Sequence, residues 1–301
     1  MANQTILVTG GTGQVGMALT AQDWPAEVSL LTPNRGELDL GSQESIAAYC
    51  ARRQIDCIIN AAGFTAVDLA EDLADAAYRA NAQGPGWLAA LARARNIPLL
   101  HISTDYVFDG KRDQPYREDD PVAPLGVYGA SKLAGERAVR EAAPRHVILR
   151  TAWVISAHRS NFLKTILRLA GEQPKLRVVA DQIGCPTSAR DIAAALRTIA
   201  LTHLAGPGAP SGTYHFANAG STSWHGLAEA IMAASARRGG AHVPALAIRS
   251  RDFPQRALRP GNSRLDTGKI ARDFGIAPRP WQEAVAEIVD ELLPMETRTS
   301  A

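Results

Sequence analysis

Thr5-Ile6-Leu7-Val8-Thr9-Gly10-Gly11-Thr12-Gly13-Gln14-Val15-Gly16 is the stretch that decides the fold. It begins as an apolar, β-branched run, typical of a strand buried on both faces, and continues with glycines spaced Gly-x-x-Gly-x-x-Gly. Such glycines permit a turn with positive φ, close approach of the backbone to a pyrophosphate, and close packing of helix on strand. A following helix would direct its free N–H groups at the phosphates. The stretch predicts a dinucleotide-binding loop, with an ordinary glycine-rich turn as the alternative.

Short apolar runs alternate with helix-length segments through the first half of the chain. The predicted strands are residues 5–9, 28–31, 57–59, 99–102 and 147–149, and the predicted helices between them include 43–53, 70–95 and 128–142. Strands that alternate with helices predict a doubly wound, Rossmann-like α/β fold, in which a parallel sheet is covered on both faces.

The second half of the chain is less regular. Proline and glycine cluster at residues 206–212, and proline and arginine at 249–264, so we predict loops there. Helices are predicted at residues 161–170, 191–201, 224–236 and 281–293. We therefore expect a dinucleotide-binding domain over residues 1–154. Residues 155–301 are expected to form mainly a smaller α/β substrate-binding lobe, with some segments returning to the first domain.

The composition is that of an ordinary globular protein: 301 residues, 46% hydrophobic and 21% charged. The formal net charge of +2 excludes a strongly basic nucleic-acid binder. The chain shows no basic and apolar leader and no apolar run long enough for a membrane span, so we expect a cytoplasmic protein without a membrane partner. Three cysteines without Cys-x-x-Cys spacing disfavour a disulfide framework or a zinc site.

A phenol and an ammonium stand four residues apart at Tyr128 and Lys132, on one face of a predicted helix. A tyrosine becomes an effective acid–base catalyst only when a nearby cation stabilises its phenolate, and Lys132 can supply that charge. Thr104 follows a predicted strand, where its hydroxyl can donate to a carbonyl oxygen that gains negative charge. Taken alone, such a pair is typical of a helix surface. Its place after the glycine loop and the strand favours catalysis.

The glycine loop, Thr104 and Tyr128-x-x-x-Lys132, in this order, resemble the extended short-chain dehydrogenase/reductase superfamily. Over nearly the whole chain, longer strings resemble its dTDP-4-dehydrorhamnose reductase family: residues 60–68 (NAAGFTAVD), 103–108 (STDYVF), 150–154 (RTAWV), 181–187 (DQIGCPT) and 259–265 (RPGNSRL). The resemblance implies an NAD(P)H-dependent oxidoreductase of nucleotide-sugar and polysaccharide synthesis. It would reduce the C4 keto group of dTDP-4-dehydro-6-deoxy-L-mannose to give dTDP-L-rhamnose.

The resemblance also implies individual roles. Tyr128 would protonate the C4 oxygen while hydride reaches C4, Lys132 would hold the nicotinamide ribose, and Thr104 would position the sugar. With the loop glycines and Arg35 added, the predicted cofactor contacts are Gly10, Gly13, Gln14, Val15, Gly16, Arg35, Asp39, Leu40, Gly63, Phe64, Thr65, Ser103, Tyr128 and Lys132. The predicted substrate contacts are Thr104, Asp105, Trp153 and Arg259.

Three residues keep two interpretations each. Trp153 lines the sugar pocket or packs in the core. Arg259 grips the diphosphate of the nucleotide sugar or lies on the surface. Asn81 stiffens the site through backbone hydrogen bonds or is solvated. Cys57, in a predicted strand, is interpreted as core packing.

The sequence departs from one property of this family. Some members are described as dimers joined by Mg²⁺ that glutamates hold, and two of those positions fall at Ala18 and Arg190. Neither side chain can ligate Mg²⁺, which prefers carboxylate oxygen. We therefore predict no metal. The usual dimer interface is in doubt, and a homodimer stays open.

This chain lacks the residues that other enzymes of the superfamily need for their reactions. Dehydratases of the superfamily carry an Asp-Glu pair after the threonine, whereas Tyr106 follows Asp105 here. GDP-fucose synthases epimerise with a cysteine in this loop, and Asp105 occupies that place. A reductase forming the C4 epimer, 6-deoxy-talose, stays open. A non-catalytic dinucleotide-binding regulatory subunit is the alternative from another class, and the intact Thr104, Tyr128 and Lys132 argue against it.

The preferred cofactor follows from the end of the second predicted strand. NAD-specific sites place an acid there to bind the adenosine ribose, but this strand continues Thr32-Pro33-Asn34-Arg35 without one before Glu37. Arg35 can meet a 2′-phosphate with charge-assisted hydrogen bonds. We predict NADPH with NADH usable. If Arg35 instead points to solvent, the site would tolerate both cofactors.

Overall fold

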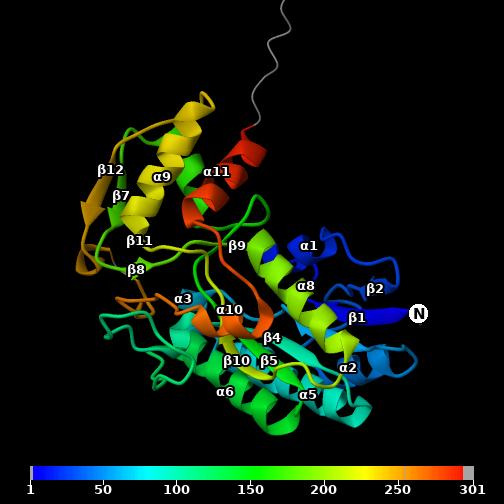
Figure 1. Ribbon diagram of the computed structural model, residues 1–301. Helices are drawn as coiled ribbons and strands as arrows, with labels where there is room; N and C mark the ends of the chain where they lie inside the picture. The colour runs from blue at the N-terminus through cyan, green and yellow to red at the C-terminus, as the bar shows by residue number, and fades with distance from the viewer. Residues whose placement is uncertain (1–2, 254, 294–301) are drawn as a thin grey trace, which may run out of the picture.

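Six parallel strands form the central sheet of the protein (Figure 1). The computed structural model describes residues 3–253 and 255–293 of the chain. In sheet order the strands are β10 (Gly212–His215), β5 (His146–Thr151), β4 (Leu99–Thr104), β3 (Cys57–Asn60), β1 (Gln4–Thr9) and β2 (Val28–Leu31). Each neighbouring pair is parallel, so the predicted doubly wound fold is confirmed.

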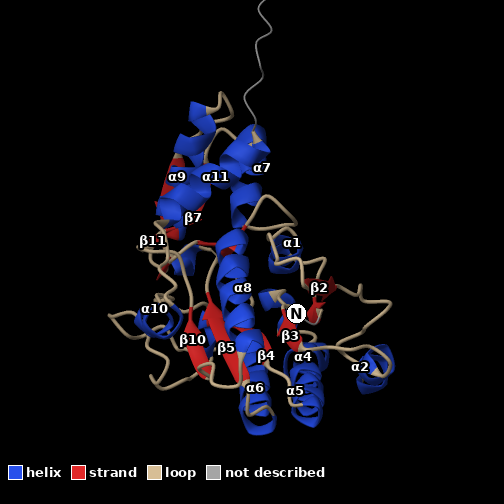
Figure 2. Cartoon of the chain, turned by 45° about the vertical axis from the view of Figure 1, so that its right-hand side comes forward, coloured by secondary structure: helices blue, strands red, loops and turns tan. Residues whose placement is uncertain are grey.

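Helices cover both faces of this sheet because its strands are apolar on both sides (Figure 2). Ile6 and Val8 pack with α1 (Gln14–Thr20) and α8 (Ala189–Ala205). Leu7 points the other way and packs with α2 (Gln43–Cys50), α5 (Gly84–Arg95) and α6 (Val127–Ala142). Cys57 is fully buried in the first of these cores, as expected.

The order of the strands in the sheet indicates where a ligand-binding crevice lies. After β1 the chain crosses to β2 on one side of it, and then to β3 on the other. Ligands of doubly wound sheets bind where the order reverses in this way, outside the carboxyl ends of the strands. The loop after β1 and the loop after β3 meet at this point. Residues of both loops, among them Gly13 and Phe64, line a crevice there.

The single helix predicted over residues 70–95 is wrong. The chain instead forms α3 (Val67–Ala70), α4 (Ala74–Tyr78), a π-helix (Arg79–Gln83) and α5. Pro85 has no N–H to donate to the carbonyl of Asn81, so the regular ladder of hydrogen bonds cannot continue through this turn. Single π-turns are frequent at functional sites, and this one contains Asn81.

A second lobe has its own core. Its helices are α7 (Phe162–Glu172), α9 (Trp224–Arg237) and α11 (Trp281–Leu292). They pack with paired short strands: β6 (Val154–Ile155) with β9 (Thr187–Ser188), β7 (Leu176–Val179) with β12 (Ala245–Ile248), and β8 (Ile183–Gly184) with β11 (Thr222–Ser223). Short 3-10 turns lie at Asp105–Val107 and Ser250–Asp252, and α10 (Gly268–Phe274) packs near β10.

Two segments of the second half of the chain belong to the sheet layer. α8 lies against α1, and β10 extends the sheet beside β5 (Figure 2). The sequence placed loops up to Gly212, but this residue begins β10. The division near residue 154 stays a prediction. In the described part of the chain, no helix combines the length and apolarity that crossing a membrane requires.

Candidate active site

One cavity of about 1400 Å³ opens at the carboxyl edge of the sheet. It brings together most of the predicted site residues: Gly10, Gly13, Gln14, Val15, Arg35, Asp39, Leu40, Gly63, Phe64, Thr65, Ser103, Thr104, Asp105, Tyr128, Lys132 and Trp153. Gly16 and Arg259 are not among its lining residues. This volume exceeds that of a site for one drug-sized ligand, so the cavity has room for a dinucleotide together with a second ligand.

The glycine loop forms a cradle that side chains would fill. Gly10 has a φ of 74°, and a Cβ there would lie 2.7 Å from the backbone nitrogen of Ala62. A Cβ at Gly16 would overlap the Gly10 carbonyl, so Gly16 permits α1 to pack on the loop and does not line the cavity. The Gly13 N–H donates to this same carbonyl at 2.9 Å. The loop therefore fits the close backbone approach that a dinucleotide diphosphate requires.

A second-lobe segment that sequence reasoning missed reaches this loop. Arg159 Nε donates to the Thr12 carbonyl at 2.6 Å, and Arg159 lines the cavity with a φ of 58°. Gln14 Oε1 accepts from Ser156 Oγ at 2.8 Å and from Asn161 Nδ2 at 3.0 Å. These contacts join parts of the chain that are far apart in sequence. They place an additional cation beside the predicted diphosphate site.

Helix α6 positions the predicted catalytic pair. Tyr128 and Lys132 lie in its first turns and face the cavity. Burial raises the pKa of Tyr128 to about 12, partly offset by a hydrogen bond with Thr104. Burial lowers the pKa of Lys132 to about 8, against the attraction of Glu136, and its Nζ donates to the Ile102 carbonyl at 2.6 Å. At neutral pH the phenol is therefore protonated and the ammonium is charged.

Asn81 secures the loop after β3 against α6. Its Oδ1 accepts from Phe64 N at 2.8 Å, and its Nδ2 donates to Phe64 O and to Ser131 Oγ, both at 3.0 Å. Ser131 Oγ in turn donates to the Tyr128 carbonyl at 2.8 Å. A Cβ on Gly63 would lie 2.8 Å from Asn81 Oδ1, which explains the glycine. Since Asn81 is fully buried, the interpretation that it stiffens the site is confirmed.

Two buried polar atoms of the cavity wall lack partners among the described residues. They are Asp105 Oδ2 and Thr151 Oγ1, at the ends of β4 and β5. Burial raises the pKa of Asp105 to about 6, although hydrogen bonds with Ser263 and Thr104 oppose this. Buried polar atoms without partners are costly, so these two are suited to hydroxyl groups of a ligand. Sequence reasoning named Asp105 and missed Thr151.

The predicted adenosine end is open and charged. The Arg35 side chain is 89% exposed, and its Nε lies 3.7 Å from Asp39 Oδ1. Arg79, from the π-helix, also lines this end, and its Cδ would lie 3.4 Å from a Cβ on Gly41. Asp39 Oδ1 accepts from the Gly41 N–H at 2.9 Å. Arg35 thus points toward solvent at the rim of the cavity, the arrangement of the alternative in which both cofactors are tolerated, and its contact with a 2′-phosphate stays a prediction.

Trp153 fits both of its interpretations, because it lines the cavity and packs in the core of the second lobe. Arg259 is not a plain surface residue: its side chain is 13% exposed and its Nη2 contacts Asp68 Oδ2 at 2.7 Å. The guanidinium also lies over the Tyr106 ring, 5.9 Å from its centroid. Arg259 already forms an ion pair with Asp68, so the contact of Arg259 with a diphosphate stays a prediction.

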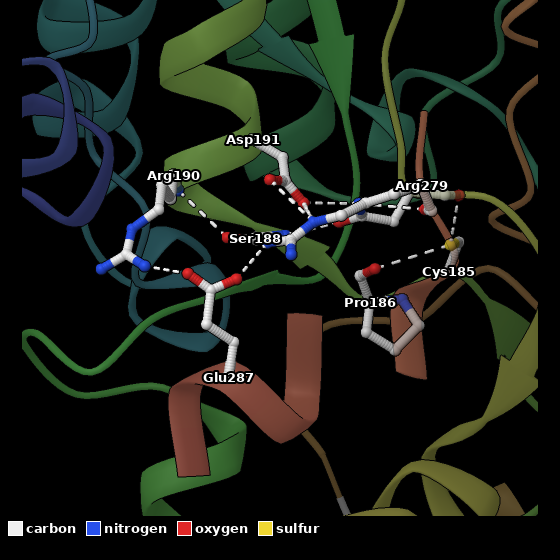
Figure 3. A network of polar contacts seen from close by, with 8 residues as sticks. Cys185, Pro186, Ser188, Arg190, Asp191, Arg279 and Glu287 are labelled. Carbon is white, nitrogen blue, oxygen red and sulfur yellow. Dashed lines mark hydrogen bonds and ion pairs between the residues drawn. The ribbon is translucent and has the colours of Figure 1, made fainter. Parts of the chain in front are cut away.

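The two residues aligned with family metal ligands, Ala18 and Arg190, line a separate cavity of about 320 Å³. Arg190 forms ion pairs with Glu287 and with Glu291, the latter at 3.2 Å. Arg279 reaches Glu287 from the other side and also pairs with Asp191 (Figure 3). Cationic arginines thus neutralise the carboxylates of this region. No His, Cys, Asp or Glu cluster of metal-site geometry occurs in residues 3–253 and 255–293. Catalysis without a metal stays a prediction.

Comparisons with known proteins agree with one another. The RmlD substrate binding domain family matches residues 4–293. A dTDP-4-dehydrorhamnose reductase from Sinorhizobium fredii is 42% identical over 96% of this chain and 97% of its own length. A dTDP-4-dehydrorhamnose reductase from Burkholderia thailandensis is 42% identical over 96% of this chain and 99% of its own length. The crystal structure of the Bacillus anthracis dTDP-4-dehydrorhamnose reductase in complex with NADP superposes with a TM-score of 0.89, at 33% identity, over 97% of this chain and all of that one. The chain belongs to the RmlD substrate binding domain family, the family of the dTDP-4-dehydrorhamnose reductases.

Proposed function

We propose that the protein reduces the C4 keto group of dTDP-4-dehydro-6-deoxy-L-mannose with NADPH and forms dTDP-L-rhamnose. The observation that carries this proposal is one cavity that holds the glycine loop, Thr104, Tyr128 and Lys132 together. Relatives that match almost the whole chain are named for this activity. A regulatory subunit would have no need for a proton donor and a neighbouring cation beside a dinucleotide-binding loop.

The residues divide the chemistry between them. Tyr128 is protonated at neutral pH because its pKa is about 12, so it can donate a proton to the C4 oxygen. Lys132 is charged below pH about 8 and stabilises the phenolate that remains. Thr104 hydrogen-bonds Tyr128 and orients its hydroxyl. Thr104 and Lys132 are buried and Tyr128 is half-buried, so the three side chains limit the access of water to the reacting oxygen.

NADPH, when bound, supplies the hydride for C4. The glycine loop offers its backbone to the diphosphate, and Arg159 adds a cation from the second lobe. Lys132 is placed to contact the nicotinamide ribose. Asp39 and Leu40 lie at the adenine end, where Arg35 and Arg79 favour a 2′-phosphate over a hydroxyl. The crystal structure with NADP supports this choice of cofactor.

A panel of dTDP-, UDP- and GDP-linked 4-keto-6-deoxy sugars tests the proposal. We expect the purified chain to oxidise NADPH with the dTDP sugar and NMR to identify dTDP-L-rhamnose. Formation of dTDP-6-deoxy-talose would assign the opposite C4 stereochemistry. Failure to oxidise NADPH with any sugar would favour the regulatory subunit. A homodimer and a cytoplasmic location stay predictions.

A further inference from the structure

Trp153 lines the cavity in a backbone conformation that is costly for a bulky residue. Its φ is 48°, in the left-handed region. Such a conformation persists only where surrounding contacts enforce it. One contact is to the backbone: Thr187 N donates to Trp153 O at 3.0 Å, beside the paired strands β6 and β9. The indole ring needs further support.

Trp224 provides that support from outside the cavity. It is the first residue of α9, and its ring stacks on Trp153 with centroids 3.5 Å apart and planes 9° apart. Phe162, the first residue of α7, packs on Trp224 with centroids 4.6 Å apart. Trp224 Nε1 donates to Gln182 Oε1 at 3.2 Å. Trp224, Phe162 and Gln182 do not line the cavity, and Trp224 connects them to it by its stack on Trp153.

Gly184 lies against the same indole. A Cβ at this position would stand 2.5 Å from Trp153 Cε2 and 2.7 Å from its Cζ2, so any side chain would displace the ring. Gly184 ends β8, which pairs with β11, and Trp224 follows β11 directly. The same two-stranded ladder therefore carries both residues that set the position of the Trp153 ring.

We propose that Trp224 and Gly184 are positioning residues of the sugar pocket. They hold the Trp153 indole in one orientation and so determine the affinity for the nucleotide sugar, without contacting it. Misplacing a positioned group by about 1 Å can cost as much as a hundredfold in an enzyme. The inference rests on the proposed function, because it takes the Trp153 wall of the cavity as the place of the sugar.

The experiment compares matched variants in the full chain. Trp224→Leu and Gly184→Ala are expected to raise KM for the dTDP-4-keto sugar by about tenfold to a hundredfold, with a smaller change in kcat. Trp224→Phe keeps a ring on Trp153 and should recover most of the affinity. The Kd for NADPH, from fluorescence titration, should change by less than about twofold in all three.

Two controls separate positioning from general damage to the lobe. Trp281→Leu makes the same substitution in the same core, outside the stack. Gly171→Ala adds a Cβ in α7 where nothing lies within 4 Å. Neither should change KM for the sugar. The coupled far-ultraviolet circular dichroism of the two stacked indoles should disappear in Trp224→Leu, weaken in Gly184→Ala and persist in Gly171→Ala.

The outcomes distinguish this inference from the proposed function. A wild type that turns over no 4-keto sugar nucleotide would refute the function. The dichroism would then test ring positioning alone. An active wild type with unchanged KM in folded Trp224→Leu and Gly184→Ala would overturn the inference. Equal increases of KM in Trp281→Leu would also overturn it, because they would show a general effect of core packing.

Discussion

The Asn81 side chain donates a hydrogen bond to the Ser131 hydroxyl at 3.0 Å, and this contact ties the π-helix to the helix that carries the catalytic pair. Through its other two bonds Asn81 also fixes Phe64 in the loop after β3. One fully buried amide therefore holds the predicted cofactor loop and the Tyr128 turn in register.

Asn81→Ala should reduce both stability and cofactor binding. It leaves Phe64 N–H and C=O without these partners, and because Phe64 is half-buried the cost per group is below the about 1–3 kcal/mol of a fully buried one. Urea unfolding and NADPH titration measure the two effects. Gln83→Ala is the control, because Gln83 is exposed in the same π-helix. Equal loss of stability in both variants would show that the Asn81 bonds are unimportant.

Tyr128→Phe should reduce kcat by about 10²–10⁴-fold while it spares NADPH binding, because it removes only the transferable proton. Steady-state kinetics and a cofactor titration provide the measurement. Tyr78→Phe removes a phenolic hydroxyl from an exposed position on α4 and should leave kcat unchanged. A Tyr128→Phe variant with the kcat of the wild type would exclude Tyr128 as the acid.

Two arginines at different parts of the predicted cofactor, Arg35 at the adenosine end and Arg159 beside the diphosphate, should respond differently. Arg35→Ala is expected to weaken binding of NADP⁺ but not of NAD⁺, because the cofactors differ only in the 2′-phosphate. Arg159→Gln keeps an N–H donor for the Thr12 carbonyl but loses the charge, so it should weaken both cofactors equally. Calorimetric Kd values for the two cofactors test this. An unchanged ratio in Arg35→Ala would remove Arg35 from the phosphate site.

Asp105 should make the stability of the protein depend on pH. Its pKa is raised to about 6 in the folded chain, from an unfolded value of 3.8. Below pH about 4 both states carry the proton. Between about pH 4 and 6 only the folded state keeps it, so this group lowers the free energy of unfolding as pH rises. Above pH about 6 the loss is complete, on the order of 3 kcal/mol.

Asp105→Asn removes this ionisation. Relative to the wild type, the variant should therefore gain stability as pH rises from 4 to 7, as measured by urea unfolding at each pH. The comparison at pH 4 serves as the reference point, because the folded state then keeps its proton and the unfolded carboxyl is only about half ionised, so little of the stability difference has developed. A difference between the two proteins that does not change with pH would contradict the raised pKa.

The local parts of this structure were predictable from the sequence. The strand before Gly10 and the glycine loop could be predicted. A strand that is buried on both faces requires a continuous run of apolar residues, and a backbone with positive φ favours glycine. The Tyr128–Lys132 spacing was predictive because residues four apart lie on one face of a helix. The segment 70–95 was predicted as one helix and its breaks were missed. Pro85 cannot donate a hydrogen bond to the Asn81 carbonyl, and the helix propensity of single residues does not include this effect.

Contacts between distant segments were not predictable. Arg159 contacts Thr12 across 147 residues, and Trp153, between β5 and β6, stacks on Trp224 at the start of α9. β10 was missed because only its pairing with β5 makes a strand of Gly212–His215. In each case the tertiary fold brings residues together that carry no mutual pattern along the chain. The site residues named through the resemblance lie in one cavity, except Gly16 and Arg259.

The most direct test of the account follows one deuterium atom. NADPH that carries deuterium at the transferable nicotinamide position is incubated with the protein and dTDP-4-dehydro-6-deoxy-L-mannose, and the product is analysed by NMR. We predict dTDP-L-rhamnose with deuterium at C4, and at least about a hundredfold less of it from Tyr128→Phe in the same initial time. Deuterium at another carbon, a product with the talo configuration, or full labelling by Tyr128→Phe would contradict the account.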